Sequence, residues 1–293
     1  MRQLKHMTWL LAFMLLIFPA CTERIDIELD STYTRLVVYG TVTTDSVRHS
    51  VELTTTSDYF SNQPAPRVKD AIVELEFNDS TMLLEECDTL DGLYMAPYAF
   101  RGLPGTTYHL KISMVDVDQD GNWETYQATS TMPAETARLD SIYLGYFFIP
   151  WWTAWEVYMV AQDPAGTRDW YGVKVWKNST LITDSLSYYT VFPDDFYDGQ
   201  YLYYGYAIAY LSDSIERERL YPGDTVTLEL NCIDKAFYDF VGDAQWELLG
   251  NNPLFSGPPA NIRSNLDNEA LGIFTAYAIE RASCIVPAEI PLK

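Results

Sequence analysis

The residues best suited to do chemistry form an acidic run, Asp116-Val117-Asp118-Gln119-Asp120-Gly121-Asn122-Trp123-Glu124. Carboxylates on alternate residues, with a glycine at the bend, resemble the first half of a calcium-binding loop, because calcium takes several carboxylate and carbonyl oxygens. The candidate ligands are Asp116, Asp118, Asp120, the backbone of Asn122, and Glu124. Gln127 stands where a complete loop needs Glu, and strands flank the run. Two hypotheses follow: a non-helical calcium site, and a polar hairpin tip turned by Asp-Gly, which the flanking strands favour.

Histidines offer little catalytic chemistry. Besides His6 near the start, the chain has only His49 and His109, each inside a predicted strand. No zinc, nucleophile-elbow, phosphate-loop or dinucleotide motif occurs. Paired carboxylates for glycoside cleavage stay open as an alternative, but 41 acidic residues offer many pairs whose separation the sequence does not give. We therefore expect a protein that is not an enzyme.

The N-terminus has the features of an export signal. Arg2 and Lys5 precede an apolar run that is too short to span a bilayer as a mature helix. The run ends at Phe18-Pro19-Ala20-Cys21, which resembles a bacterial lipobox although Phe18 replaces the usual Leu. We predict a signal peptide over residues 1–20, lipidation of Cys21, and a tether over 21–31 that anchors the protein to a membrane.

Three cysteines remain after Cys21, so at most one intramolecular disulfide can form. Cys232 and Cys284 lie on strand-like segments of the C-terminal half and are the favoured pair, with buried free thiols as the alternative. Without residues 1–20 the chain has 17 basic and 41 acidic residues, a net charge of −24. Such a surface repels nucleic acid and favours cations, basic partners or simple solubility.

Aromatic residues make up 15% of the chain and concentrate in its second half. Most of them should pack in the core, because alternation along strands sends half of the side chains inward. Loops that present aromatic side chains could instead grip a ligand or partner. The candidate contact surface consists of Trp151, Trp152, Phe196 and Tyr197.

The elements around these residues read mainly as strands. Alternating β-branched segments with turns between them predict an immunoglobulin-like or prealbumin-like β-sandwich over 32–135, beginning with a hairpin turned near Thr44-Asp45. Met132-Pro133 suggests a boundary, followed by an aromatic-rich β domain over 136–293. Apolar residues at three- and four-residue spacing predict one helix near 234–249.

The order of these features resembles a known family. The chain is similar to the Bacteroidota outer-membrane lipoproteins of domain-of-unknown-function family 4249. The segments that carry the similarity are the lipobox, Leu36-Val-Val-Tyr-Gly40, Asp91-Gly-Leu-Tyr94, Gly102-Leu-Pro-Gly105, Leu139-Asp-Ser-Ile142 and Leu271-Gly-Ile-Phe-Thr-Ala276. The resemblance covers nearly the whole mature chain and brings no catalytic residues. It implies an outer-membrane accessory to a TonB-dependent uptake receptor. The acidic residues after Cys21 resemble the surface-export signals of such lipoproteins, so we expect display at the cell surface. The alternatives are an adhesin or pilus-anchoring lipoprotein and a surface hydrolase.

Overall fold

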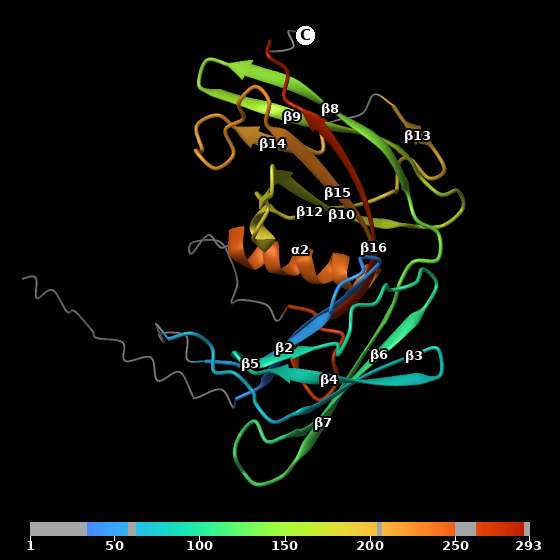
Figure 1. The fold of residues 1–293 in the computed structure, drawn as a ribbon, viewed down its shortest axis with the longest axis vertical. Coiled ribbons are helices and arrows are strands. Elements are labelled where there is room, and N and C mark those ends of the chain that lie inside the picture. Colours follow the sequence, from blue (N-terminus) through green and yellow to red (C-terminus); the bar gives the residue numbers. More distant parts are fainter. Residues whose placement is uncertain (1–33, 58–62, 204–206, 250–261, 290–293) are drawn as a thin grey trace, which may run out of the picture. The chain divides into compact units, whose positions relative to one another are not determined.

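The computed structural model describes residues 34–57, 63–203, 207–249 and 262–289. Residues 34–293 belong to one compact unit. The predicted signal peptide, Cys21 and the tether lie outside the described residues. The unit is mainly β, as its alternating sequence predicts (Figure 1).

The strands of the first half follow the segments predicted from alternation. They form a continuous antiparallel series in the order β1-β2-β5-β4-β3-β6-β7. The predicted first hairpin is confirmed, because β1 and β2 pair antiparallel. The bounds are β1 Leu36–Thr43, β2 Ser50–Thr55, β3 Ile72–Phe77, β4 Ser80–Cys87, β5 Leu90–Met95, β6 Thr107–Val115 and β7 Glu124–Thr131.

The second half adds strands to the same sheet and builds a smaller one. β10, β11, β12, β15 and β16 extend the large sheet, while β8, β9, β13 and β14 form a sheet around β9. The bounds are β8 Arg138–Ile149, β9 Trp152–Gln162, β10 Trp170–Lys177, β11 Thr180–Leu181, β12 Thr190–Pro193, β13 Tyr201–Leu202, β14 Ala209–Ser212, β15 Thr225–Ile233 and β16 Leu271–Ile285, with a 3-10 turn η1 at Leu186–Tyr188.

The last strand, β16, joins the two halves. Its first part, Leu271 to Tyr277, pairs parallel with β1, and its second part, from Ala278 to Ile285, pairs antiparallel with β15. Figure 1 shows it running from the strands of the first half to those of the second. The predicted boundary at residues 135 and 136 falls between β7 and β8, and the large sheet contains strands from both sides of it. The division into two domains stays a prediction.

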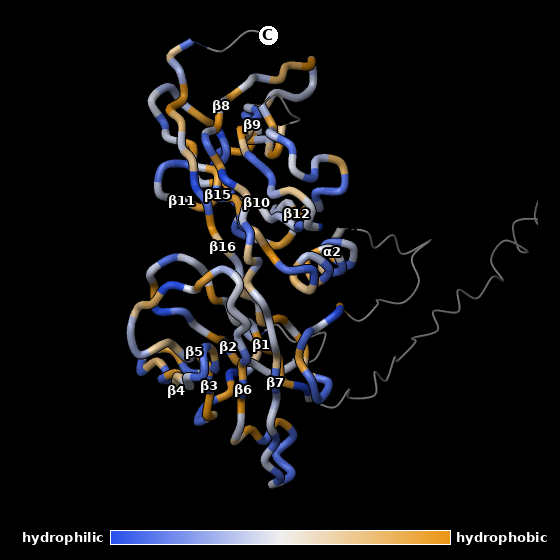
Figure 2. The backbone as a smooth tube through the Cα atoms, turned by 90° about the vertical axis from the view of Figure 1, so that its right-hand side faces the viewer, coloured by the Kyte–Doolittle hydropathy of each residue, from blue (hydrophilic) through white to orange (hydrophobic). Residues whose placement is uncertain are grey.

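The core follows from the alternation of side chains along the strands, visible as alternating colours in Figure 2. In β6, for example, Tyr108, Leu110 and Ile112 are buried, whereas His109 between them is exposed. One apolar cluster extends from the β1–β7 strands into β8–β10, β15 and β16. Burial of this kind is the main stabilising term for a mainly β protein.

The predicted helix near residue 234 is confirmed as α2, Lys235–Leu249, and is the only α-helix in the described residues. Asp234 provides its N-cap: one carboxylate oxygen, Oδ1, accepts the Phe237 N–H at 2.8 Å. Phe237, Phe240 and Val241 pack against Tyr277 of β16 in a second apolar cluster. Among the described residues, no helix has both the length and the apolar character that crossing a membrane requires.

Candidate functional site

Two of the most exposed aromatic side chains in the second half, Phe148 and Trp151, lie at the tip of the β8–β9 hairpin. Ile149 pairs with Trp152, so Pro150 and Trp151 form the turn itself. Trp151 is 82% exposed and Phe148 is 70% exposed. We name the aromatic tip as Phe147, Phe148, Trp151, Trp152 and, from β14, Tyr210.

Three rings of the aromatic tip, those of Phe147, Trp152 and Tyr210, pack against one another. The Trp152 ring centroid lies 5.3 Å from that of Phe147 and 5.6 Å from that of Tyr210. Tyr210 is held beside the hairpin because β14 pairs with β9, with Tyr210 opposite Glu156. Rigid, amphipathic rings of this kind lose little entropy on contact and are common in protein–protein hot spots. The geometry suits recognition of a partner or ligand surface.

The four aromatic residues predicted to form a contact surface do not lie together. Trp151 and Trp152 belong to the aromatic tip, whereas Phe196 and Tyr197 lie in the turn between β12 and β13. β13 pairs with Ala161 and Gln162 at the other end of β9. Ten residues of strand, roughly 34 Å, separate that end from Trp152. Phe196 is exposed, but Tyr197 is half-buried against Phe192, with ring centroids 6.5 Å apart.

The predicted calcium loop joins β6 to β7 and is exposed, at the lower end of the molecule in Figure 2. Oxygens of Asp116, Asp118 and Asp120 lie within 4.8 Å of one another. Backbone amides already use them: Asp116 accepts from the N–H groups of Asp120 at 3.1 Å and Gly121 at 3.0 Å. These bonds are those of a polar hairpin tip.

The other two predicted ligands of this loop, Asn122 and Glu124, form hydrogen bonds within the protein. The backbone and side-chain amides of Asn122 donate to Asp120 at 2.7 and 2.8 Å. Glu124 accepts a hydrogen bond from the Tyr126 hydroxyl at 2.6 Å. The Asn122 bonds hold the pKa of Asp120 below its usual value. Calcium binding by this exposed loop stays a prediction.

A second group of three aspartates, which sequence reasoning missed, consists of Asp163, Asp169 and Asp194, with Asp163 and Asp194 buried. One carboxylate oxygen from each lies within 4.8 Å of the others. Each residue immediately follows or precedes a strand, at the ends of β9, β10 and β12. The only signal in the sequence is an aspartate at three strand ends, and strand pairing is needed to bring them together.

The predicted disulfide between Cys232 and Cys284 is wrong for this structure, in which both thiols are free. Cys232 lies opposite Ala278 on β16, whereas Cys284 lies six residues further along, opposite Val226. That offset corresponds to about 20 Å, far beyond the roughly 7 Å limit between Cα atoms for a disulfide. Burial raises the pKa of Cys232 to about 12 and that of Cys284 to about 11.

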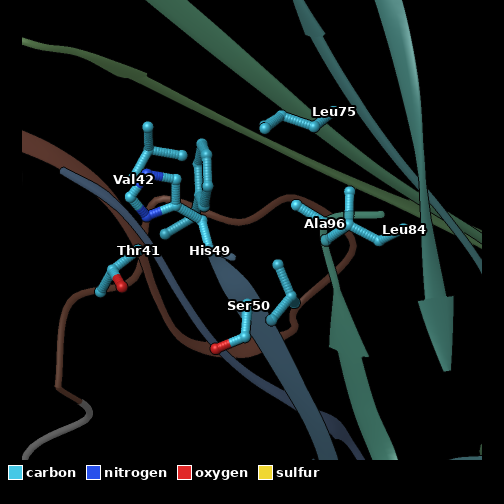
Figure 3. Close-up of a pocket in the computed structure, with 9 residues that line it drawn as sticks. Thr41, Val42, His49, Ser50, Leu75, Leu84 and Ala96 are labelled. Atoms are coloured by element: carbon cyan, nitrogen blue, oxygen red, sulfur yellow. The ribbon is translucent and has the colours of Figure 1, made fainter. Parts of the chain in front are cut away.

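Both histidines make structural contacts. His49 is buried, with Nε2 3.0 Å from the Phe100 carbonyl oxygen, and burial lowers its pKa. Figure 3 shows its imidazole near the side chain of Val42. The cavity there is about 10 Å³, room for roughly one water molecule. His109 shares a hydrogen bond with the Thr129 hydroxyl at 2.9 Å on the exposed face of β6.

Comparison with known protein families identifies a match over most of the chain. The model of a family described as a domain of unknown function, DUF4249, matches residues 22–283. No curated protein matches the chain. The matched range begins one residue after Cys21 and includes every strand except the last two residues of β16.

Proposed function

Because the chain belongs to the DUF4249 family, whose function is unknown, we propose that it is a non-catalytic outer-membrane lipoprotein of a Bacteroidota cell. In this proposal it is anchored by lipid on Cys21 and acts as an accessory to a TonB-dependent uptake receptor. It contacts the receptor or its cargo through the aromatic tip. The observation that carries the proposal is the exposure of Trp151 and Phe148 at the tip of the β8–β9 hairpin.

The location rests on the N-terminal sequence. Phe18-Pro19-Ala20-Cys21 offers a cleavage site and a thiol for lipid transfer, and β1 begins only fifteen residues after Cys21. A cysteine that carries several acyl groups anchors a protein stably, whereas a single acyl group gives only marginal membrane binding. An anchored protein needs only modest affinity for a neighbouring receptor, because both are confined to one membrane.

The charge of the chain supports contact through apolar groups. A net charge of −24 for the mature chain repels anionic headgroups and other acidic surfaces. Aromatic side chains can supply affinity where the surrounding charge does not. The aromatic tip joins several rings, and truncating a central ring of such a cluster typically costs about 2 kcal/mol or more of binding free energy.

The direct test is an affinity pull-down of the tagged protein from native outer membranes in mild detergent, with copurifying proteins identified by mass spectrometry. We expect a stoichiometric TonB-dependent barrel. The double variant Phe148→Ala, Trp151→Ala should lose most of it, at least about 10-fold. Trp246→Ala is the matched control, because Trp246 is 74% exposed on α2 and lies outside the aromatic tip.

Other outcomes would redirect the assignment. Recovery of copies of the same chain alone would favour the adhesin or pilus-anchoring alternative. Equal barrel recovery with the double variant would exclude the aromatic tip as the contact surface. Separately, Cys21→Ser should release the protein from membranes, and continued anchoring of that variant would refute lipidation.

A further inference from the structure

Asp163, Asp169 and Asp194, which we call the buried aspartate cluster, lie where the two sheets meet. Asp163 directly follows β9 of the smaller sheet, and Asp169 directly precedes β10 of the large sheet. Asp194 directly follows β12, which pairs with β10 so that Pro193 lies opposite Trp170. The Asp194 N–H donates to the Asp169 carbonyl at 3.1 Å. Strand register therefore fixes the cluster.

The cluster concentrates negative charge away from water. Asp163 is 4% exposed and Asp194 is 2% exposed, with one oxygen of each carboxylate within 4.8 Å of the others. In the part of the chain that the structure describes, none of the three forms an ion pair, and the nearby Arg168 pairs with Asp195. Buried carboxylates without a counter-charge are costly, by several kcal/mol each.

Hydrogen bonds satisfy only some of the carboxylate oxygens. Asp163 accepts from the Tyr171 hydroxyl and from the Gly199 N–H at 2.8 Å. Asp169 accepts from the Thr167 hydroxyl at 2.8 Å. In contrast, Oδ2 of Asp194 is fully buried and has no hydrogen-bond donor among the described residues. A fully buried carboxylate oxygen without a donor needs a physical explanation, and a cation bound among the three carboxylates would provide one.

We propose that Asp163, Asp169 and Asp194 form a binding site for a calcium ion. Three carboxylates supply hard oxygen ligands, the class that Ca²⁺ prefers, and its flexible coordination of six to eight oxygens suits ligands from three separate strand ends. Mg²⁺ fits less well because it demands octahedral geometry and keeps its waters. The ion would supply the positively charged partner that Oδ2 of Asp194 lacks among the described residues.

Calcium would have a structural effect at this site. It would tie the end of β9 to β10 and β12, and so hold the smaller sheet on the large one. It would also fix the turn after Asp194, which carries Phe196, 87% exposed. Gly199 closes this turn with a φ of +69°, and a side chain there would meet the Cβ of Ala165 at 2.7 Å.

The alternative to a cation is a shared proton. Burial raises the pKa of Asp163 and of Asp169, and neighbouring carboxylates, including Asp198, raise them further. A protonated carboxyl would then donate to a neighbouring oxygen. The two states differ in one respect that can be measured: only the cation site responds to calcium at constant pH.

The test uses the processed full chain, stripped with EDTA and titrated with CaCl₂ or MgCl₂ by calorimetry and thermal unfolding. We expect one calcium per chain and a rise in melting temperature of about 5–10 °C at 100 times Kd. Asp194→Asn should weaken calcium binding at least about 10-fold. In EDTA it should be no less stable than the wild type, because it removes a buried charge.

Asp118→Asn is the matched control, since it alters the exposed loop alone and should leave the response intact. A calcium response lost in Asp118→Asn but kept in Asp194→Asn would overturn the proposal, as would the absence of any response in the wild type. If Asp194→Asn does not fold, Asp169→Asn takes its place. Terbium luminescence, sensitised by nearby Tyr171 and displaced by calcium, should be kept in Asp118→Asn and lost in Asp194→Asn; the reverse pattern, or no sensitised emission in the wild type, would count against the site.

Discussion

The hydroxyl of Ser130 should contribute more to stability than its size suggests, because it joins three elements. Ser130 is buried on β7, accepts the Ala276 N–H of β16 at 2.8 Å, and donates to Oδ2 of Asp234, the N-cap of α2. Ser130→Ala removes both bonds at once. A buried amide left without an acceptor costs about 1–3 kcal/mol, and a lost hydrogen bond to a carboxylate costs about 1.5–3 kcal/mol.

We therefore expect Ser130→Ala to lower the free energy of unfolding by about 3–5 kcal/mol. The assay is urea unfolding followed by tryptophan fluorescence. Thr129→Ala is the control, because the neighbouring Thr129 hydroxyl bonds His109 on the exposed face and should cost less than about 1 kcal/mol. A loss for Ser130→Ala as small as that of the control would refute the reasoning, since it would mean that Ala276 and Asp234 find other partners.

Three further predictions concern the stability of the fold. Gly272→Ala should prevent folding, because Gly272 has a φ of +95° and a Cβ there would lie 1.9 Å from the Val38 carbonyl oxygen; circular dichroism showing a native β spectrum would contradict this. Burial raises the pKa of Asp234, so the folded protein holds this proton more tightly than the unfolded chain does. The stabilisation that this difference gives the fold is therefore present at low pH and is lost as the pH rises from about 4 through the pKa of the folded state. In urea titrations, the free energy of unfolding of the wild type, relative to that of Asp234→Asn, should fall over that pH range. Dithiothreitol should leave the melting temperature unchanged, because Cys232 and Cys284 are free; a decrease would reveal a bond.

Local patterns predicted most of the elements. Alternation identified strands such as β3 and β6, since one face of each packs in the core. Three- and four-residue spacing identified α2, and Asp234 stands at its predicted start as the cap. These features depend on neighbours in the sequence, which is why they could be read without a structure.

Features set by register could not be predicted in this way. Cys232 and Cys284 both lie on strands, but only the pairing of β15 with β16 shows that they are far apart. Likewise, Asp163, Asp169 and Asp194 are separated by up to 31 residues and meet because β10 pairs with β12. The sequence signalled the exposed Asp116–Asp120 run more strongly than the buried aspartates, because a continuous motif is visible and a long-range one is not.

The position of β16 sets the order in which this chain can fold. The ribosome makes β1 more than 200 residues before β16, yet the two strands pair over seven residues. Until β16 arrives, β1 and β15 each present an unpaired edge, the kind of surface through which nascent β proteins aggregate. Folding is therefore expected to be completed only after β16 has been made, and slowly, because the contacts between β1 and β16 are far apart in the sequence. A nonsense mutation before Leu271 would consequently disrupt both halves of the sheet.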